Sequence, residues 1–247
     1  MAPDGEPHMD MIWTGIVKAV GTLVSFDREI YSIAWMTVKI TGVATLIGLC
    51  IGIPAGLGLS VSRFPGRRLI IALINTGMGL PPVVVGLFVA LFLWRRGPLG
   101  SLHLIYTPAA MVIAQVLIVV PIIAGLSLAA FQNVDPSALL QARALGASKA
   151  QGLLVILKES RLPQMAAVMA GFGGAISEVG AVLMVGGNIT GQTRVLTTAI
   201  VQETRMGRFE VAIALSLILL VLSFAVNAFL TYIQQKGALE WRLHTWK

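Results

Sequence analysis

The fold is decided by stretches such as residues 108–132, which read PAAMVIAQVLIVVPIIAGLSLAAFQ and contain no Asp, Glu, Lys or Arg. A helix needs about 20 apolar residues to cross the roughly 30 Å of hydrocarbon in a bilayer. Lipid offers no hydrogen bonds to an open backbone, so a run of this length must satisfy its own peptide groups. Residues 108–132 are therefore predicted to cross a membrane as a helix.

The rest of the chain has the same character. Hydrophobic residues make up 56% of its 247 residues and charged residues only 12%, against about 25% charged in a soluble domain. The sequence predicts an all-α integral membrane protein with about five transmembrane helices. The predicted spans are Tyr31–Ser62, Leu69–Trp94, Pro108–Gln132, Gln164–Gly187 and Val211–Ile233.

Three segments are expected in the domain organisation. Residues 1–28 form a polar start and an amphipathic helix over Ile12–Phe26 that lies in the membrane interface. His8-Met9 resembles a cloning junction, so the native chain is expected to begin at Met9 or Met11. Residues 29–233 form the transmembrane domain with a long loop at 133–163, and residues 234–247 form a tail.

The basic residues predict the orientation of the chain. If the 63–68 link, the 133–163 loop and the C-terminus share one side, that side holds ten Lys and Arg and the other holds seven. The excess of Lys and Arg marks the cytoplasmic side. We therefore expect the N-terminus outside and the C-terminus and the 133–163 loop inside. Basic residues scattered between apolar runs fit this arrangement better than nucleic-acid binding.

The 133–163 loop has a pattern of its own. Asp135 and Pro136 suit the cap and first turn of a helix over Ala138–Leu145, and Gly146 is expected to end it in a left-handed conformation. Leu139, Leu140 and Leu145 would then be apolar side chains on a helix in water. Such a helix requires a partner groove.

Several residues inside the predicted spans suggest more than a passive anchor. Pro81, Pro82 and Pro121 each remove a backbone hydrogen bond, which lipid cannot replace, so kinks there favour a gated pathway. Glycines 48, 52 and 56 share a helix face that permits close helix contact. Simple packing of a bundle is the alternative for both features. Glu178 is the only acidic residue well inside a span, where we expect a hydrogen-bonding or packing role rather than substrate contact.

In the 133–163 loop and in two of the predicted spans, the sequence resembles the permease subunits of bacterial ABC importers. Their coupling loop carries an EAA motif, three further residues and a glycine, and here residues 140–142 read LQA and Gly146 follows at the expected place. Leu140 replaces the glutamate, and Leu162-Pro163 comes four residues later than in the general pattern. Residues 80–86 (LPPVVVG) and 175–188 (AISEVGAVLMVGGN) are similar to the molybdate and tungstate permeases, and the five spans resemble the tungstate-specific branch.

This resemblance implies a set of partners and sites. A second copy of the chain would complete one pathway for an oxyanion, tungstate first and molybdate next, in the bacterial inner membrane. Two separate ATPase subunits would bind ATP and Mg and dock on the loop, and an extracytoplasmic binding protein would deliver the substrate. No cofactor is expected in this chain, which has no phosphate-binding G-x4-G-K-[ST] loop. The residues expected to couple to the ATPase are Leu140, Gln141, Ala142, Arg143, Leu145, Gly146, Ala147 and Ser148.

The remaining assignments concern the pathway and the outer side. A pathway or gating role is expected for Pro81, Pro82, Gly86, Pro121, Glu178 and Gly180. Arg194, Arg205 and Arg208 could attract anions to an outer vestibule, contact the delivery protein, or face only water. An intramembrane enzyme is disfavoured because no span combines the side chains that hydrolysis needs. The main alternative function is a self-contained secondary transporter or channel for a small anion.

Overall fold

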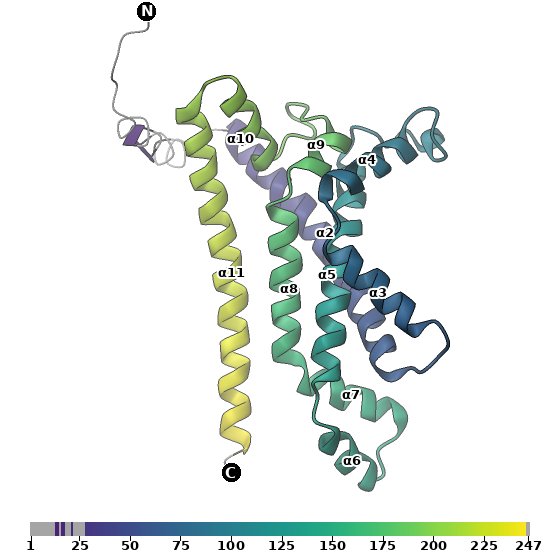
Figure 1. The fold of residues 1–247 in the computed structure, drawn as a ribbon. Coiled ribbons are helices and arrows are strands. Elements are labelled where there is room, and N and C mark those ends of the chain that lie inside the picture. The colour runs from purple at the N-terminus through teal and green to yellow at the C-terminus, as the bar shows by residue number, and fades with distance from the viewer. Residues whose placement is uncertain (1–12, 15, 18–20, 22–27, 246–247) are drawn as a thin grey trace, which may run out of the picture. The chain divides into compact units, whose positions relative to one another are not determined.

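A computed structural model describes residues 13–14, 16–17, 21 and 28–245, with side chains to residue 236. Most of the predicted amphipathic helix, the start at residues 1–8 and the last two residues of the predicted tail lie outside this part of the chain. The described residues form helices and no strands (Figure 1). The helices are α2 (Arg28–Val61), α3 (Arg67–Met78), α4 (Pro82–Leu93), the 3₁₀ turn η1 (Gly100–Leu102), α5 (Pro108–Gln132), α6 (Pro136–Ala144), α7 (Lys149–Glu159), α8 (Arg161–Ile176), α9 (Gly180–Gly186), α10 (Leu196–Arg205) and α11 (Phe209–Thr245).

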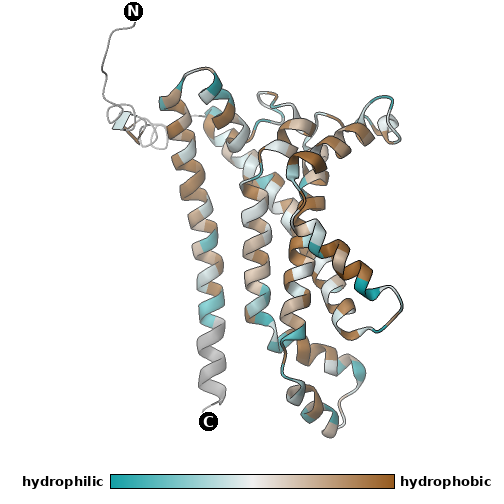
Figure 2. Cartoon of the chain, in the orientation of Figure 1, coloured by the Kyte–Doolittle hydropathy of each residue, from teal (hydrophilic) through white to brown (hydrophobic). Residues whose placement is uncertain are grey.

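The five predicted spans correspond to these helices, with two corrections. Among the described residues, α2, α5 and the 209–236 part of α11 are each long and apolar enough to cross a membrane. The second and fourth spans are not single helices but broken pairs, α3 with α4 and α8 with α9. Figure 2 shows hydrophobic colouring along the helices and hydrophilic colouring mainly at their ends and in the links. The first break follows from Pro81-Pro82, which removes two consecutive backbone donors.

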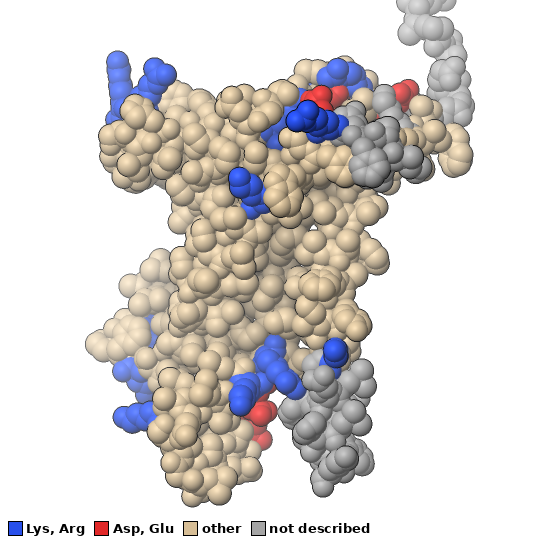
Figure 3. All heavy atoms as spheres, turned by 180° about the vertical axis from the view of Figure 1, so that it is seen from behind, with Lys and Arg blue, Asp and Glu red and all other residues tan. Residues whose placement is uncertain are grey.

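The chain divides into two compact units. Unit 1 comprises Met1–Val43, Pro82–Gln115 and Ile176–Ala225, and unit 2 comprises Ala44–Pro81, Val116–Ala175 and Val226–Lys247. The three segments predicted to be cytoplasmic all belong to unit 2, and the links predicted to be outside belong to unit 1. Unit 2 holds ten basic and three acidic residues, whereas unit 1 holds eight of each. Figure 3 shows Lys and Arg in a few groups, with uncharged residues over most of the face in view.

Unit 2 is organised by close contact between α2 and α5. A Cβ added to Gly48 would lie 2.6 Å from Val119 Cγ1, and one added to Gly52 would lie 2.8 Å from Ile123 Cγ2. A Cβ on Gly56 would lie 2.9 Å from the carbonyl oxygen of Ala124. The close helix contact predicted from these three glycines is confirmed, because no larger residue fits at this spacing. Val119 and Ile123 form the core here together with Ala175 of α8.

Unit 1 has its core where α2, α10 and α11 meet. The buried side chains are Ile33, Leu196, Ala199, Leu215 and Ile218. The Thr37 hydroxyl accepts a hydrogen bond from the Leu196 N–H at 2.9 Å and donates to the carbonyl of Ile33 at 2.8 Å. An unpaired N–H at the start of α10 is thereby satisfied by a side chain of α2. Helix α10 was not predicted, although Leu196, Ala199 and Ile200 have the spacing of one helix face.

Candidate functional site

The loop between α5 and α8 begins with a helix start of the predicted kind. Asp135 Oδ1 accepts a hydrogen bond from the backbone N–H of Ser137 at 2.8 Å, and Pro136 occupies the first helical position. Two hydrogen bonds from Ser137, a stronger one from its backbone and a weaker one from its side chain, lower the pKa of Asp135 below its ordinary value. Helix α6 runs from Pro136 to Ala144, two residues earlier at its start and one at its end than predicted. The expected short helix with an aspartate cap is confirmed.

Gly146 ends α6 in the conformation expected of it. Its φ is +85°, in the left-handed region that favours glycine. The N–H of Ala147 donates to the carbonyl of Ala142, and the N–H of Gly146 donates to that of Arg143, each at 3.0 Å. This pair of bonds is the Schellman arrangement, which satisfies carbonyls left open at a helix end. The turn is closed by its own backbone.

Helix α7 starts directly after this turn with a reciprocal cap. The Ser148 hydroxyl accepts from the Gln151 N–H at 3.3 Å, and Gln151 Oε1 accepts from the Ser148 N–H at 2.7 Å. Two of the open donors at the helix start are thus satisfied. A Cβ on Gly152 of α7 would lie 3.0 Å from Leu139 Cδ1 of α6. The two short helices therefore pack on one another through Leu139.

The opposite side of the loop is bare. Leu145 is 89% exposed and Leu140 is 63% exposed, while Gln141, Arg143, Gly146 and Ser148 are also exposed. Ala142 and Ala147 are half-buried. Because exposed leucines in water are unfavourable by about 1.5–3 kcal/mol each relative to burial, this side has the character of a docking surface.

The fourth span breaks at residues 177–179, which corrects the position predicted for Glu178. This residue does not lie in the middle of a continuous helix but just before α9. Its side chain is buried, and Oε1 accepts a hydrogen bond from the Ala181 N–H at 2.7 Å. Its carbonyl accepts from the Thr197 hydroxyl at 3.0 Å. A carboxylate at a helix start satisfies an open N–H and complements the helix dipole.

Two glycines allow α4 and α9 to pack at backbone distance. A Cβ on Gly86 would lie 2.5 Å from the Cα of Ala181, and a Cβ on Gly180 would lie 2.5 Å from Val83 Cγ2. Pro82 begins α4. The structure thus brings Gly86 and Gly180 to one contact in unit 1, with Pro82 at the start of α4 and Glu178 just before α9. Pro81 and Pro121 belong to unit 2, where a Cβ on Gly77 of α3 would lie 2.8 Å from Pro121 Cβ.

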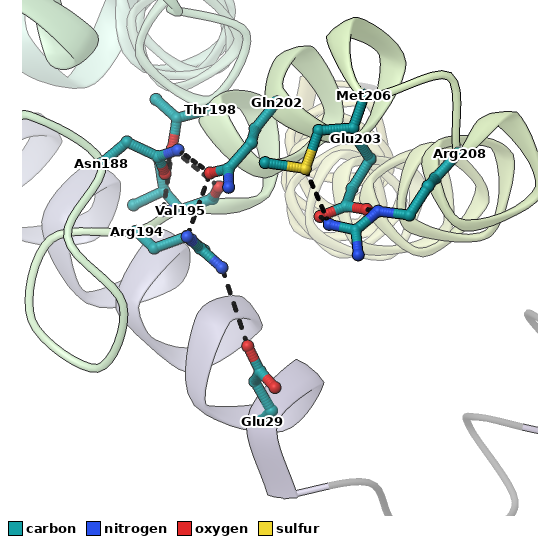
Figure 4. A network of polar contacts seen from close by, with 9 residues as sticks. All are labelled: Glu29, Asn188, Arg194, Val195, Thr198, Gln202, Glu203, Met206 and Arg208. Atoms are coloured by element: carbon teal, nitrogen blue, oxygen red, sulfur yellow. Dashed lines mark hydrogen bonds and ion pairs between the residues drawn. The ribbon is translucent and has the colours of Figure 1, made fainter.

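The three arginines assigned to an outer vestibule have different surroundings, and Figure 4 shows two of them, Arg194 and Arg208. Arg194 donates to Gln202 Oε1 at 3.0 Å and lies 3.7 Å from Glu29 Oε1, and its side chain is only 15% exposed. Arg208 pairs with the buried Glu203 at 2.7 Å. Arg205 is exposed. Two of the three arginines are thus engaged by side chains of unit 1.

The polar network around Arg194 was missed by sequence reasoning. Asn188 donates from its amide nitrogen to Gln202 Oε1, and its amide oxygen accepts from the Thr198 hydroxyl at 2.9 Å. The Thr193 hydroxyl donates to the Gly186 carbonyl at 2.5 Å and accepts from the Ile189 N–H at 2.9 Å. The only signal in the sequence is the concentration of Asn, Thr and Gln between two apolar runs. That composition indicates a loop without indicating its partners.

Comparison with known proteins agrees with this architecture. Residues 48–237 match the family described as "Binding-protein-dependent transport system inner membrane component". The chain is 42% identical over 228 residues to the tungstate uptake system permease protein TupB of Peptoclostridium acidaminophilum. That alignment covers 92% of this chain and 100% of the other protein. It is 41% identical over 202 residues to a probable anion ABC transporter permease protein of Haloferax volcanii, covering 80% of this chain and 87% of that protein.

A solved structure shows the same fold. A chain of a bacterial alginate ABC transporter, crystallised with an alginate-bound periplasmic protein, superposes with a TM-score of 0.76 at 15% identity, covering 92% of this chain and 87% of that chain. Permease subunits of this kind are not catalytic, since ATP hydrolysis belongs to a separate ATPase, so neither an enzyme nor a self-contained transporter is the correct assignment. The chain belongs to the family of inner-membrane permease components of binding-protein-dependent ABC importers, and within it to the tungstate type.

Proposed function

We propose that two copies of this chain form the membrane pathway of an ATP-driven importer of tungstate, with molybdate as the next candidate. The substrate assignment is supported by the permease of P. acidaminophilum, which is named for tungstate uptake and aligns along its whole length. The H. volcanii relative, named as an anion transporter permease, supports an oxyanion more generally. The homodimer is part of the proposal because one chain supplies one set of spans.

The observation that carries the coupling role is the bare side of the α6–α7 loop. Leu140 is exposed on α6 and Leu145 is exposed directly after it, and α6 has a cap at each end. An apolar helix face of this kind fits a groove in a partner protein. We assign that groove to an ATPase subunit, one for each copy of the chain, which also holds ATP and Mg.

The geometry supports transmission by rigid movement. Leu139 packs against Gly152, and only Ser160 separates α7 from α8. The Ser160 N–H donates to the Ile156 carbonyl at 3.0 Å, and the Ser160 carbonyl accepts from the Gln164 N–H of α8 at 2.9 Å, so the backbone hydrogen bonding continues across that junction. Displacement of the loop by a closing ATPase dimer therefore reaches α8 directly. Pro81, Pro82, Gly86, Pro121, Glu178 and Gly180 are proposed to form the parts of the pathway that respond.

The outer partner is proposed to be an extracytoplasmic substrate-binding protein. The alginate transporter was crystallised with such a periplasmic protein, which supports this kind of partner. Unit 1 would face that protein, and Arg205 is the most accessible of the three arginines assigned to the outer side. A basic side chain there would favour the approach of an anion.

Uptake by reconstituted vesicles tests the substrate and the energy source together. The chain is reconstituted with its ATPase and binding protein, and tungsten inside the vesicles is measured by mass spectrometry. We expect uptake that requires ATP and the binding protein and that molybdate inhibits more strongly than sulfate. Uptake that proceeds without the ATPase, or that sulfate inhibits best, would contradict the proposal.

Reporter fusions test the orientation separately. Fusions after Arg68, at Ser148 and after Lys247 should all report the cytoplasm, because these positions belong to unit 2 with its excess of basic residues. A periplasmic signal at Ser148 would contradict both the orientation and the docking role of the loop.

A further inference from the structure

Helix α6 has a second side, which faces a groove in unit 2 of 1070 Å³. Leu139 and Arg143, four residues apart and therefore on one helix face, both line it. Leu140 and Leu145, the exposed leucines proposed to meet the ATPase, do not line it. The groove therefore differs from the exposed apolar surface at Leu140 and Leu145, although the two adjoin on the loop, since Arg143, Ala147 and Ser148, which are also expected to couple to the ATPase, line the groove.

The lining of the groove is basic. It includes Arg63, Arg143 and Lys149 and a single acidic residue, Asp135. The Asp135 carboxylate is already engaged by the N–H of Ser137. Arg67, which is not part of the lining, donates from Nε to the carbonyl of Leu59 at 2.7 Å. This carbonyl in the last turn of α2 is therefore paired with a cation. The three basic side chains therefore give the groove a net attraction for anions.

The position of the groove indicates which anion it holds. Its walls include Val61 and residues 131–132, where α2 and α5 end, and both helices are long and apolar enough to span a membrane. Phe131, Leu153 and Ile156 add apolar surface beside the basic residues. A site with cations at a helix end and apolar side chains next to them matches the two parts of a phospholipid, and basic pockets beside transmembrane helices bind anionic headgroups.

We propose that this groove binds an anionic phospholipid, with the phosphate of the headgroup at Arg63, Arg143 and Lys149 and an acyl chain along the apolar wall. Assignment to the cytoplasmic leaflet rests on the orientation proposed above, but binding itself does not. A bound lipid would link the inner side of α6 to the ends of α2 and α5.

Native mass spectrometry of the purified full chain tests this directly. The chain is titrated with phosphatidylglycerol or phosphatidylcholine of identical acyl chains, and the lipid-bound fraction is measured. We expect phosphatidylglycerol to bind at least tenfold more tightly. Arg63→Gln with Lys149→Gln should weaken it roughly thirtyfold, about fivefold for each basic residue removed, while Arg63→Lys with Lys149→Arg should retain it.

The matched control is Arg68→Gln with Lys158→Gln, which removes the same charge at exposed positions outside the groove lining. It should change affinity by less than threefold. Equal losses in both double variants would overturn the proposal, because binding would then follow net charge alone.

Displacement of the lipid by equimolar inorganic phosphate would assign the groove to a free anion. Displacement by the ATPase would assign it to that protein. Either result also overturns the proposal. The assay uses no transport, so loss of tungstate uptake leaves it unaffected.

Discussion

The α6–α7 loop and the 177–206 segment both connect apolar helices, yet they hold their conformations in different ways. In the loop each cap is closed by a residue nearby in the chain, as Asp135 is by Ser137 and Ser148 by Gln151. In the 177–206 segment local bonds, such as that between Glu178 and Ala181, are joined by bonds over much longer separations. The Leu196 N–H reaches the Thr37 hydroxyl 159 residues away, and the Thr197 hydroxyl reaches the Glu178 carbonyl 19 residues away.

This difference determines how each segment should respond to movement and to substitution. A segment closed by local bonds keeps its shape when it moves, and it can leave Leu140 and Leu145 exposed for a partner. A segment tied to other helices is stable only where those helices hold it. Substitutions in the loop should therefore alter coupling while the fold persists, and substitutions in the 177–206 segment or against it should alter the fold itself.

The largest effect is expected at the contact of α4 with α9. In Gly86→Val the Cβ would lie 2.5 Å from the Cα of Ala181, and backbone cannot move aside as a flexible side chain can. Overpacking costs about 1–3 kcal/mol and occasionally more, so we expect loss of folded protein. Thermal unfolding in detergent, followed by the monodisperse fraction, measures this.

Gly42 of α2 provides the matched control. A Cβ there has no atom within 4 Å, so Gly42→Ala should be neutral or stabilising because alanine favours the helix. If Gly86→Val and Gly42→Ala have the same unfolding temperature, the close approach of α4 and α9 is not what stabilises unit 1.

The next effect is expected in the loop, where the fold should persist. Gly146→Val places a β-branched residue at φ +85°, which costs on the order of 1–3 kcal/mol and should open the turn between α6 and α7. We expect at least a tenfold loss of substrate-stimulated ATPase activity in the reconstituted complex, with an unfolding temperature within a few degrees of wild type.

Gly146→Asn distinguishes backbone strain from loss of space. Asparagine adopts positive φ more readily than valine, and a Cβ at this position has no atom within 4 Å. Most of the coupled activity should therefore be retained. Loss of activity in both variants would show that the left-handed turn is not the feature that matters.

How far each region could be predicted follows from the same difference. The aspartate cap, the short helix and the glycine turn of the loop depend on neighbours in the sequence, and all three are confirmed. Residues 177–179 read SEV between two apolar runs, and the predicted fourth span includes Ser177 and Glu178 in one continuous helix, so the break was not predicted. Helix α10 and the polar network around Arg194 depend on partners such as Thr37 and Glu29, which no local pattern identifies.

A smaller effect is expected at Glu178. Its Oε1 accepts from the Ala181 N–H, and the side-chain oxygen of glutamine can do the same. Glu178→Gln should therefore keep most tungstate uptake and leave the preference between tungstate and molybdate unchanged. Glu178→Leu removes the cap, which costs about 1 kcal/mol, and should lower the yield of assembled complex. If Glu178→Gln abolishes uptake while the complex stays assembled, the charge belongs to the pathway and not to the helix start.

The smallest effect is expected at the cap of α6 and depends on pH. Hydrogen bonds from Ser137 lower the pKa of Asp135 in the folded protein. A lowered pKa means that the stabilisation is present above the ordinary pKa of 3.8 and is lost as the pH falls below it, through the folded value. Hydrogen exchange of α6, corrected for intrinsic rates, should therefore show protection that declines below about pH 4. Asp135→Asn keeps a capping oxygen without a titrating proton, so its protection should be flat over the same range. Helix α7, capped by Ser148 and Gln151, is the internal control, and an equal decline in α6 and α7 would mean that acid loosens unit 2 as a whole.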